Sequence, residues 1–169
     1  MNARSFVSLL VGIVLVALAA GVVANRWDSE HPVCDYEALS PIKGEYRAGS
    51  FYERELEPLG ELLKLVDVPL TCIVIDAYCH LSDEKAPGLG AYLVEANHLE
   101  IPVIGVAKNR FRDSQHAVEL IRGESQKPLF VTAIGMDYER ASQLVGGMAG
   151  KHRIPDLLKV ADRLARKIV

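Results

Sequence analysis

The feature that most constrains the fold of this chain is an uncharged apolar run near its start. Between Arg4 and Arg26, residues 6–24 read FVSLLVGIVLVALAAGVVA and contain no charged side chain. An apolar run of about 18 residues or more is long enough for a membrane-spanning helix. Buried strands also read as continuous apolar stretches, and the Val and Ile content and the two glycines of this run suit strands. Two interpretations therefore stay open, a membrane anchor and buried β-structure.

The rest of the chain alternates short apolar runs with segments of helical periodicity. The pattern predicts strands at 33–42 (an edge strand), 69–78, 101–108, 117–123 and 127–135, the last two as a pair with a turn between them. It predicts helices at 53–66, 88–99, 137–150 and 154–168. Such alternation indicates an α/β fold, a mixed or parallel sheet covered by helices. We divide the 169 residues into an apolar N-terminal segment, 1–26, and one domain, 27–169.

Cysteine content and net charge bear on the cellular compartment of the protein and on its binding partners. Cys34, Cys72 and Cys79 form no CxxC pair, no zinc-type spacing and no even set for disulfides. A reducing, cytoplasmic compartment is therefore expected, with a single-pass anchor at residues 6–24 as the alternative. The net charge of −3 gives no bulk attraction to nucleic acid, but it is compatible with a local basic groove.

Charged residues close two of the predicted buried strands. Asp76 follows CIVI and Lys108 follows VIGVA. Functional groups gather at the carboxyl ends of strands in such sheets, although a charge there can also simply mark the edge of the core. If Glu55 reaches the same rim, two carboxylates and a lysine converge. Such a group favours a raised pKa or a bound Mg²⁺ or Mn²⁺, which could support phosphodiester cleavage.

Four segments together resemble the endonuclease V family, metal-dependent nucleases that act on deoxyinosine in DNA and, for some members, inosine in RNA. They are YRAGSFYERE (46–55), VIDAY (74–78), GLGAYL with IPVIGVAK (88–108) and KPLFVTAIG (127–135). The similarity runs from about Trp27 to Lys167. It implies an RNase H-like fold, a mixed sheet flanked by helices.

The resemblance also implies roles for individual residues. Glu55 and Asp76 would bind Mg²⁺, with Mn²⁺ as a substitute, and Lys108 would lie near the scissile phosphate. Tyr46 would belong to a wedge inserted where the modified base leaves the stack, a use of aromatic residues consistent with base flipping. Gly49 would let that wedge turn. Arg54 would contact phosphate, or form a salt bridge on its helix.

The sequence departs from the family at the metal site. The family's first strand carries a third metal-binding aspartate, whereas here no acidic residue precedes Asp28. The N-terminus is then an altered first hairpin, a membrane anchor, or part of a homologue that binds without cutting. His80 could replace a missing histidine, although a loop histidine is usually solvated. Asp137 could supply a ligand or cap the following helix. Asp83 and Glu84 are expected on the loop surface.

Three functions follow from these observations. The first is a Mg²⁺-dependent endonuclease of DNA repair that cuts near deaminated purines. The second is a catalytically impaired homologue that still binds nucleic acid, either DNA alone or DNA and RNA. The third is a membrane-attached α/β domain with an unrelated ligand. We expect a monomer in each case.

Overall fold

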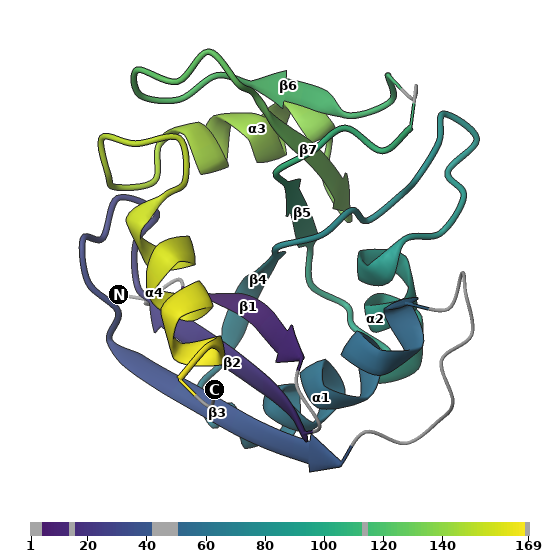
Figure 1. Cartoon of the computed structure of the whole chain (residues 1–169), viewed down its shortest axis with the longest axis vertical. Helices are drawn as coiled ribbons and strands as arrows, with labels where there is room; N and C mark the ends of the chain where they lie inside the picture. Colours follow the sequence, from purple (N-terminus) through teal and green to yellow (C-terminus); the bar gives the residue numbers. More distant parts are fainter. Residues whose placement is uncertain (1–4, 14–15, 42–50, 113–114, 168–169) are drawn as a thin grey trace.

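The chain is organised around a single mixed β-sheet (Figure 1). The computed structural model describes residues 5–13, 16–41, 51–112 and 115–167. Within them the sheet has seven strands, in the spatial order β3-β2-β1-β4-β5-β7-β6. The strands are β1 (Ser5–Ile13), β2 (Val16–Ala24), β3 (Cys34–Pro41), β4 (Leu70–Ile75), β5 (Val103–Ala107), β6 (Val118–Leu120) and β7 (Leu129–Ile134). The helices are α1 (Phe51–Leu65), α2 (Leu89–Asn97), α3 (Tyr138–Gly146) and α4 (Asp156–Ala165).

The apolar run at residues 6–24 forms two interior strands of this sheet. β1 pairs antiparallel with β2 and parallel with β4, so it has a neighbour on each side. β2 in turn pairs with the edge strand β3. Layers on both faces remove the need for polar alternation along such strands, which accounts for the uncharged sequence. The run is thus a hairpin, and not the single helix that an anchor at 6–24 requires.

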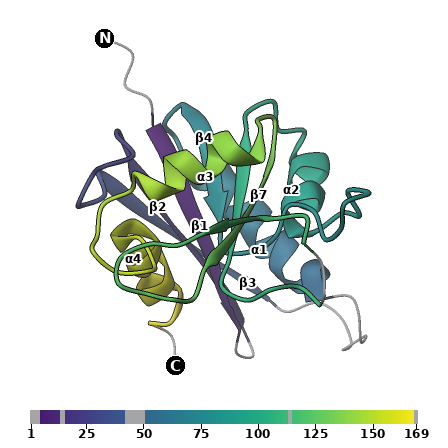
Figure 2. The same ribbon diagram turned by 90° about the horizontal axis from the view of Figure 1, so that it is seen from above.

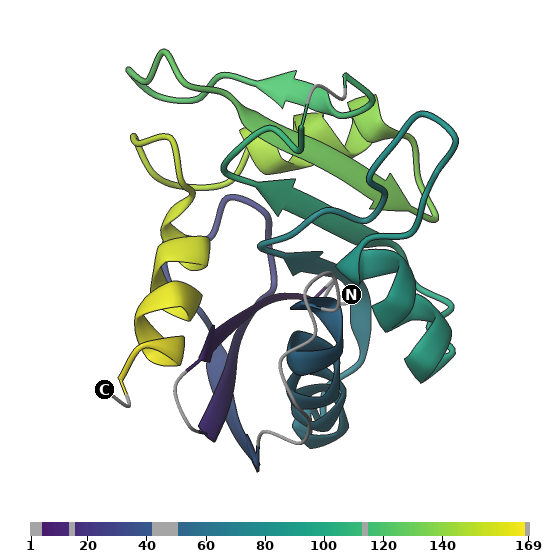
Figure 3. The same cartoon turned by 45° about the vertical axis from the view of Figure 1, so that its right-hand side comes forward.

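Helices cover both faces of the sheet. In β4, Ile73 and Ile75 point into the core beneath α1 and α2, whereas Cys72 and Val74 point into the core beneath α3 and α4. This alternation is the two-residue period of a strand buried on both sides. Figure 2 shows α1 and α2 together on one side of the molecule and α4 on the other, and Figure 3 shows the strands passing between α4 and α1. None of the helices in the described ranges is both long and apolar enough to span a bilayer.

The elements expected from the sequence are confirmed, with shifted ends. The strand expected at 69–78 ends at Ile75, because the chain then turns across the face of the sheet. It crosses β5 at Gly105, where an added Cβ would lie 2.5 Å from the carbonyl oxygen of Ala77. It is then held over β7 by a hydrogen bond from the Cys79 amide to Thr132 Oγ1 (2.8 Å). Because glycine has no Cβ, this close approach of two backbones is accommodated.

The three cysteines form no disulfide with one another. Cys72 is buried in the core, and Cys34, Cys72 and Cys79 are all free thiols. Burial raises the pKa of the Cys72 and Cys79 thiols to about 12, so neither is a reactive thiolate at neutral pH.

Candidate active site at the ends of β4 and β5

Asp76 and Lys108 meet at the carboxyl ends of two adjacent strands. β4 and β5 run parallel, with Ile75 opposite Gly105, so both strands end at the same rim. The Lys108 ammonium donates to Asp76 Oδ2 and forms an ion pair with it. The side chain of Asp76 is 18% exposed and that of Lys108 35% exposed, so the pair is only partly screened by water. The expected meeting of the two strand ends is confirmed.

Glu55 approaches the same rim from the first half of α1. Its side chain is half-buried. Burial raises the pKa of the Glu55 carboxyl, and the negative charge of Asp76 raises it further. Two carboxylates that repel each other in a partly dry site form a place where a cation is favoured. Asp76 therefore interacts electrostatically with both Lys108 and Glu55.

Glu55 and Asp76 are candidates for holding a divalent cation. Mg²⁺ prefers oxygen ligands and is commonly bound through one or two carboxylates, with waters and substrate phosphates completing its shell. Glu55 and Asp76 would be the two carboxylates of such a site. The part of the chain that the structure describes contains no group of three His, Cys, Asp or Glu side chains arranged to hold a metal.

The strand register shows which β1 residue stands beside Asp76. Ser8 pairs with Val74 and Leu9 with Ile75, so Leu10 is the next residue, at the level of Asp76. The backbone position from which a third carboxylate could join the pair is thus a leucine. Ser8 pairs with Val74 instead, so Leu10 is the better position on β1 for an introduced aspartate.

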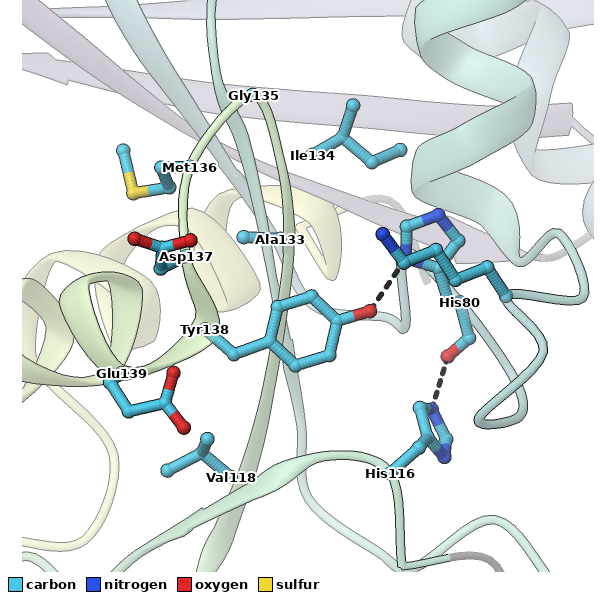
Figure 4. A pocket seen from close by; sticks show the side chains of 11 residues that line it. His80, His116, Val118, Ala133, Ile134, Gly135, Met136, Asp137, Tyr138 and Glu139 are labelled. Atoms are coloured by element: carbon cyan, nitrogen blue, oxygen red, sulfur yellow. Dashed lines mark hydrogen bonds between the residues drawn. The ribbon is translucent and has the colours of Figure 1, made fainter.

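His80 and Asp137 line a separate cavity (Figure 4). Its volume is about 490 Å³, and its wall includes His80, Lys85, His116, Met136, Asp137 and Tyr138. Glu55, Asp76 and Lys108 do not line it. The structure thus does not bring Asp137 to the carboxylate pair as a substitute ligand. Asp137 does stand at the N-cap position of α3, but its side chain makes no capping hydrogen bond.

The environment of His80 differs from that of an ordinary loop histidine. Its Nδ1 atom shares a hydrogen bond of 2.7 Å with the Tyr138 hydroxyl, and its carbonyl oxygen is within 2.5 Å of His116 Nε2. Burial lowers the pKa of His80, and the nearby Lys85 and His116 lower it further. The expectation of a solvated side chain is therefore wrong, because the loop folds back over the sheet at Gly105. Asp83 and Glu84 are exposed, as expected.

The remaining predicted site residues belong to α1 or precede it in the sequence. Tyr46 and Gly49 lie in 42–50, outside the described residues. Arg54 lies in α1 with a half-buried side chain. Arg153, which the sequence analysis missed, donates to the carbonyl oxygens of Lys108 and Pro128. Only the tertiary fold brings it there, 45 residues after Lys108, so no local pattern could have identified it.

Comparison with solved structures places this fold beside known nucleases. Endonuclease V from Streptomyces avermitilis superposes with a TM-score of 0.78 and 25% identity, covering 98% of this chain and 81% of its own. Human ENDOV superposes with a TM-score of 0.75 and 18% identity, covering 98% of this chain and 84% of its own. A. aeolicus Argonaute superposes with a TM-score of 0.55 and 13% identity, covering 99% of this chain and 29% of its own. No protein-family model and no curated protein sequence matches the chain. The likeness confirms the RNase H-like fold and the resemblance to endonuclease V.

Proposed function

With the endonuclease V fold of this chain as the premise, we propose that it is a metal-dependent endonuclease. Its substrate would be a phosphodiester near a deaminated purine, deoxyinosine in DNA or inosine in RNA, and its role DNA repair. The observation that carries the proposal is the meeting of Asp76 and Lys108 at the carboxyl ends of adjacent parallel strands. Endonuclease V proteins from two organisms share the fold that creates this rim.

Glu55 and Asp76 would hold the cation, Mg²⁺ or Mn²⁺ as a substitute. Their mutual repulsion supports this assignment, because a cation between them would relieve it. When bound, such an ion lowers the pKa of a coordinated water and stabilises a leaving oxygen. The chain itself supplies the two carboxylates on two rigid elements, the end of β4 and the first half of α1.

Lys108 would hold the phosphate beside the carboxylates. An ammonium group has three donors, so Lys108 can keep its bond to Asp76 and donate to a phosphate oxygen as well. Its positive charge would offset the negative charge that develops on the phosphate oxygens during cleavage. The hydrogen bond from Arg153 to the Lys108 carbonyl fixes the backbone from which this side chain extends.

The segment before α1 would recognise the substrate, as its resemblance to the family motif implies. In this proposal Tyr46 inserts beside the turned-out base, Gly49 allows the turn, and Arg54 contacts phosphate or braces α1. The free thiols of the described core suit a reducing compartment, and a cytoplasmic monomer belongs to the same proposal.

Nicking of a modified duplex tests the proposal. A labelled duplex with one deoxyinosine, and the matching RNA with one inosine, are incubated with the protein in Mg²⁺, in Mn²⁺ and in EDTA. We expect a cut near the modified base only when the metal is present, and no cut in the unmodified duplex. Cleavage that persists in EDTA would overturn the metal assignment, and equal cleavage of both duplexes would overturn the substrate.

A second candidate is a protein that binds the same nucleic acid without cutting it. The observation in its favour is Leu10, which stands at the level of Asp76 where a third carboxylate could have joined. The two candidates give different results in one pair of measurements. A preference for the inosine duplex in EDTA, together with no cut at high Mn²⁺, would support binding alone.

A further inference from the structure

Positive charges gather in three loops on one side of Asp76. Lys108, Arg110 and Arg112 follow β5, Lys127 precedes β7, and Lys151 and Arg153 precede α4. We call these six residues the basic strip. They belong to a chain whose net charge is −3, so the strip is a local departure from the overall charge.

The three loops meet at the same edge of the sheet. β5 and β7 are antiparallel, with Ala107 opposite Phe130, so the end of β5 lies beside the start of β7. The Arg153 guanidinium joins the loops by donating to the carbonyl oxygens of Lys108 and Pro128. The Arg110 guanidinium carbon lies 5.0 Å from the centre of the Phe130 ring. The strip therefore begins at the Asp76–Lys108 pair and extends across β5 and β7.

A buried arginine holds the last of these loops in place. Arg122 is 7% exposed, and its guanidinium donates to the carbonyl oxygens of Met148, Gly150, His152 and Arg153. The loop also packs onto Gly123, where an added Cβ would lie 2.3 Å from the carbonyl oxygen of Lys151. These contacts give Lys151 and Arg153 a defined position relative to Lys108.

Only two of the six residues of the strip have a counter-charge within the described part of the chain. Lys108 pairs with Asp76, and Arg110 pairs with Glu119. Arg112, Lys127 and Lys151 are exposed and form no ion pair within the described part of the chain. Cations held together in this way favour a polyanion with regularly spaced charges, and a nucleic-acid backbone has that form.

We propose that the basic strip binds the phosphodiester backbone on the β5–β7 side of Asp76. The nucleic acid would thus extend from the carboxylate pair toward the loop before α4. This inference rests on the proposed function, because it needs a nucleic acid at the Asp76–Lys108 rim. It specifies the direction in which the bound nucleic acid extends from the site, and it assigns phosphate contacts to Lys127 and Lys151.

The salt dependence of binding tests the strip. Affinity for a deoxyinosine duplex is measured in EDTA over a series of KCl concentrations for the parent and for Lys127→Gln/Lys151→Gln. Each lost phosphate contact lowers the slope of log K against log salt by about 0.9, so the double variant should lose about 1.8. The matched control is Lys64→Gln/Arg166→Gln, which removes the same charge from exposed side chains of α1 and of the residue after α4. The control should keep the parent slope.

The outcomes separate the strip from the proposed function. A parent that binds with a slope unchanged in the strip variant would overturn the strip and leave the proposed function standing. Equal losses in the strip variant and its control would show only a general charge effect, and would also overturn it. A parent with no affinity for any duplex would overturn both proposals. Thermal unfolding of each variant shows that the fold is kept.

Discussion

β1 and β4 are neighbouring parallel strands that end in different ways. Both lie inside the same sheet, and neither has a charged residue along its paired length. β4 is followed by Asp76, which pairs with Lys108 at the end of β5. In β1 the residue at the level of Asp76 is Leu10, and the strand continues with Val11 and Gly12. The comparison indicates that the sheet depends on the uncharged body of a strand, whereas the ion pair of the candidate site depends on the residue at its end.

The largest expected effect is at the charged end of β4. Asp76→Asn keeps the size of the side chain and removes its charge, so the proposed cation would lose one of its two protein carboxylates. Since changes even to groups that only orient metal ligands cost about 10- to 100-fold, we expect cleavage to fall by at least about 100-fold. Single-turnover nicking at fixed Mg²⁺ measures this, and circular dichroism checks the fold. Cleavage at the parent rate would show that Asp76 holds no metal.

A smaller effect is expected at Glu55, where a substitution should increase the stability of the fold. Glu55→Gln removes a carboxylate whose pKa is raised by burial and by Asp76. Because the folded state holds the Glu55 proton more tightly, parent stability falls as pH rises from the ordinary pKa of 4.5 through the raised value. The variant should therefore be more stable than the parent at pH 7 in EDTA.

Thermal unfolding between pH 4 and pH 8 measures the Glu55 effect. The gain should shrink toward zero below the ordinary pKa, where the carboxyl is protonated in both states. The variant should also lose Mg²⁺-dependent cleavage. A variant less stable than the parent at pH 7 would instead indicate that Glu55 forms a stabilising ion pair.

The smallest expected effect lies in the cavity beside α3. Tyr138→Phe removes the hydroxyl that shares a hydrogen bond with His80 Nδ1. Loss of one partly buried hydrogen bond should lower the free energy of unfolding by about 0.5–1.5 kcal/mol. Cleavage should not change, because Glu55, Asp76 and Lys108 do not line this cavity. Chemical denaturation and the nicking assay measure the two effects, and a loss of cleavage would join the cavity to the active site.

Much of the fold could be predicted from local patterns. The β-branched runs that became β4 and β5, and the helical spacing of α1 and α4, are strong signals over short stretches. The charged residues at the two strand ends were equally visible, and their meeting followed from the parallel geometry of the sheet. Only the N-terminal run stayed ambiguous, because a buried strand pair and a membrane helix are both uniformly apolar.

The parts that could not be predicted depend on contacts between distant segments. The position of His80 depends on a backbone crossing at Gly105, and that of Lys151 on the reach of Arg122 across 26 to 31 residues. Such contacts have no periodicity, and an isolated glycine or arginine gives no signal of them. The position of Leu10 at the level of Asp76 likewise depends on the pairing register of β1 with β4, which the uncharged sequence of β1 does not specify.

Restoring a carboxylate to β1 tests the central claim, that Leu10 occupies the position of a missing metal ligand beside Asp76. Nicking of a deoxyinosine duplex is measured against Mg²⁺ concentration for the parent, Leu10→Asp, the uncharged control Leu10→Asn, and Ser8→Asp, whose site pairs with Val74 instead. Unfolding temperature with and without Mg²⁺ is measured for each protein. We expect Leu10→Asp alone to need about 10- to 100-fold less Mg²⁺ and to gain thermal stability from it. Efficient cleavage by the parent at ordinary Mg²⁺, with no gain in Leu10→Asp, would contradict the account.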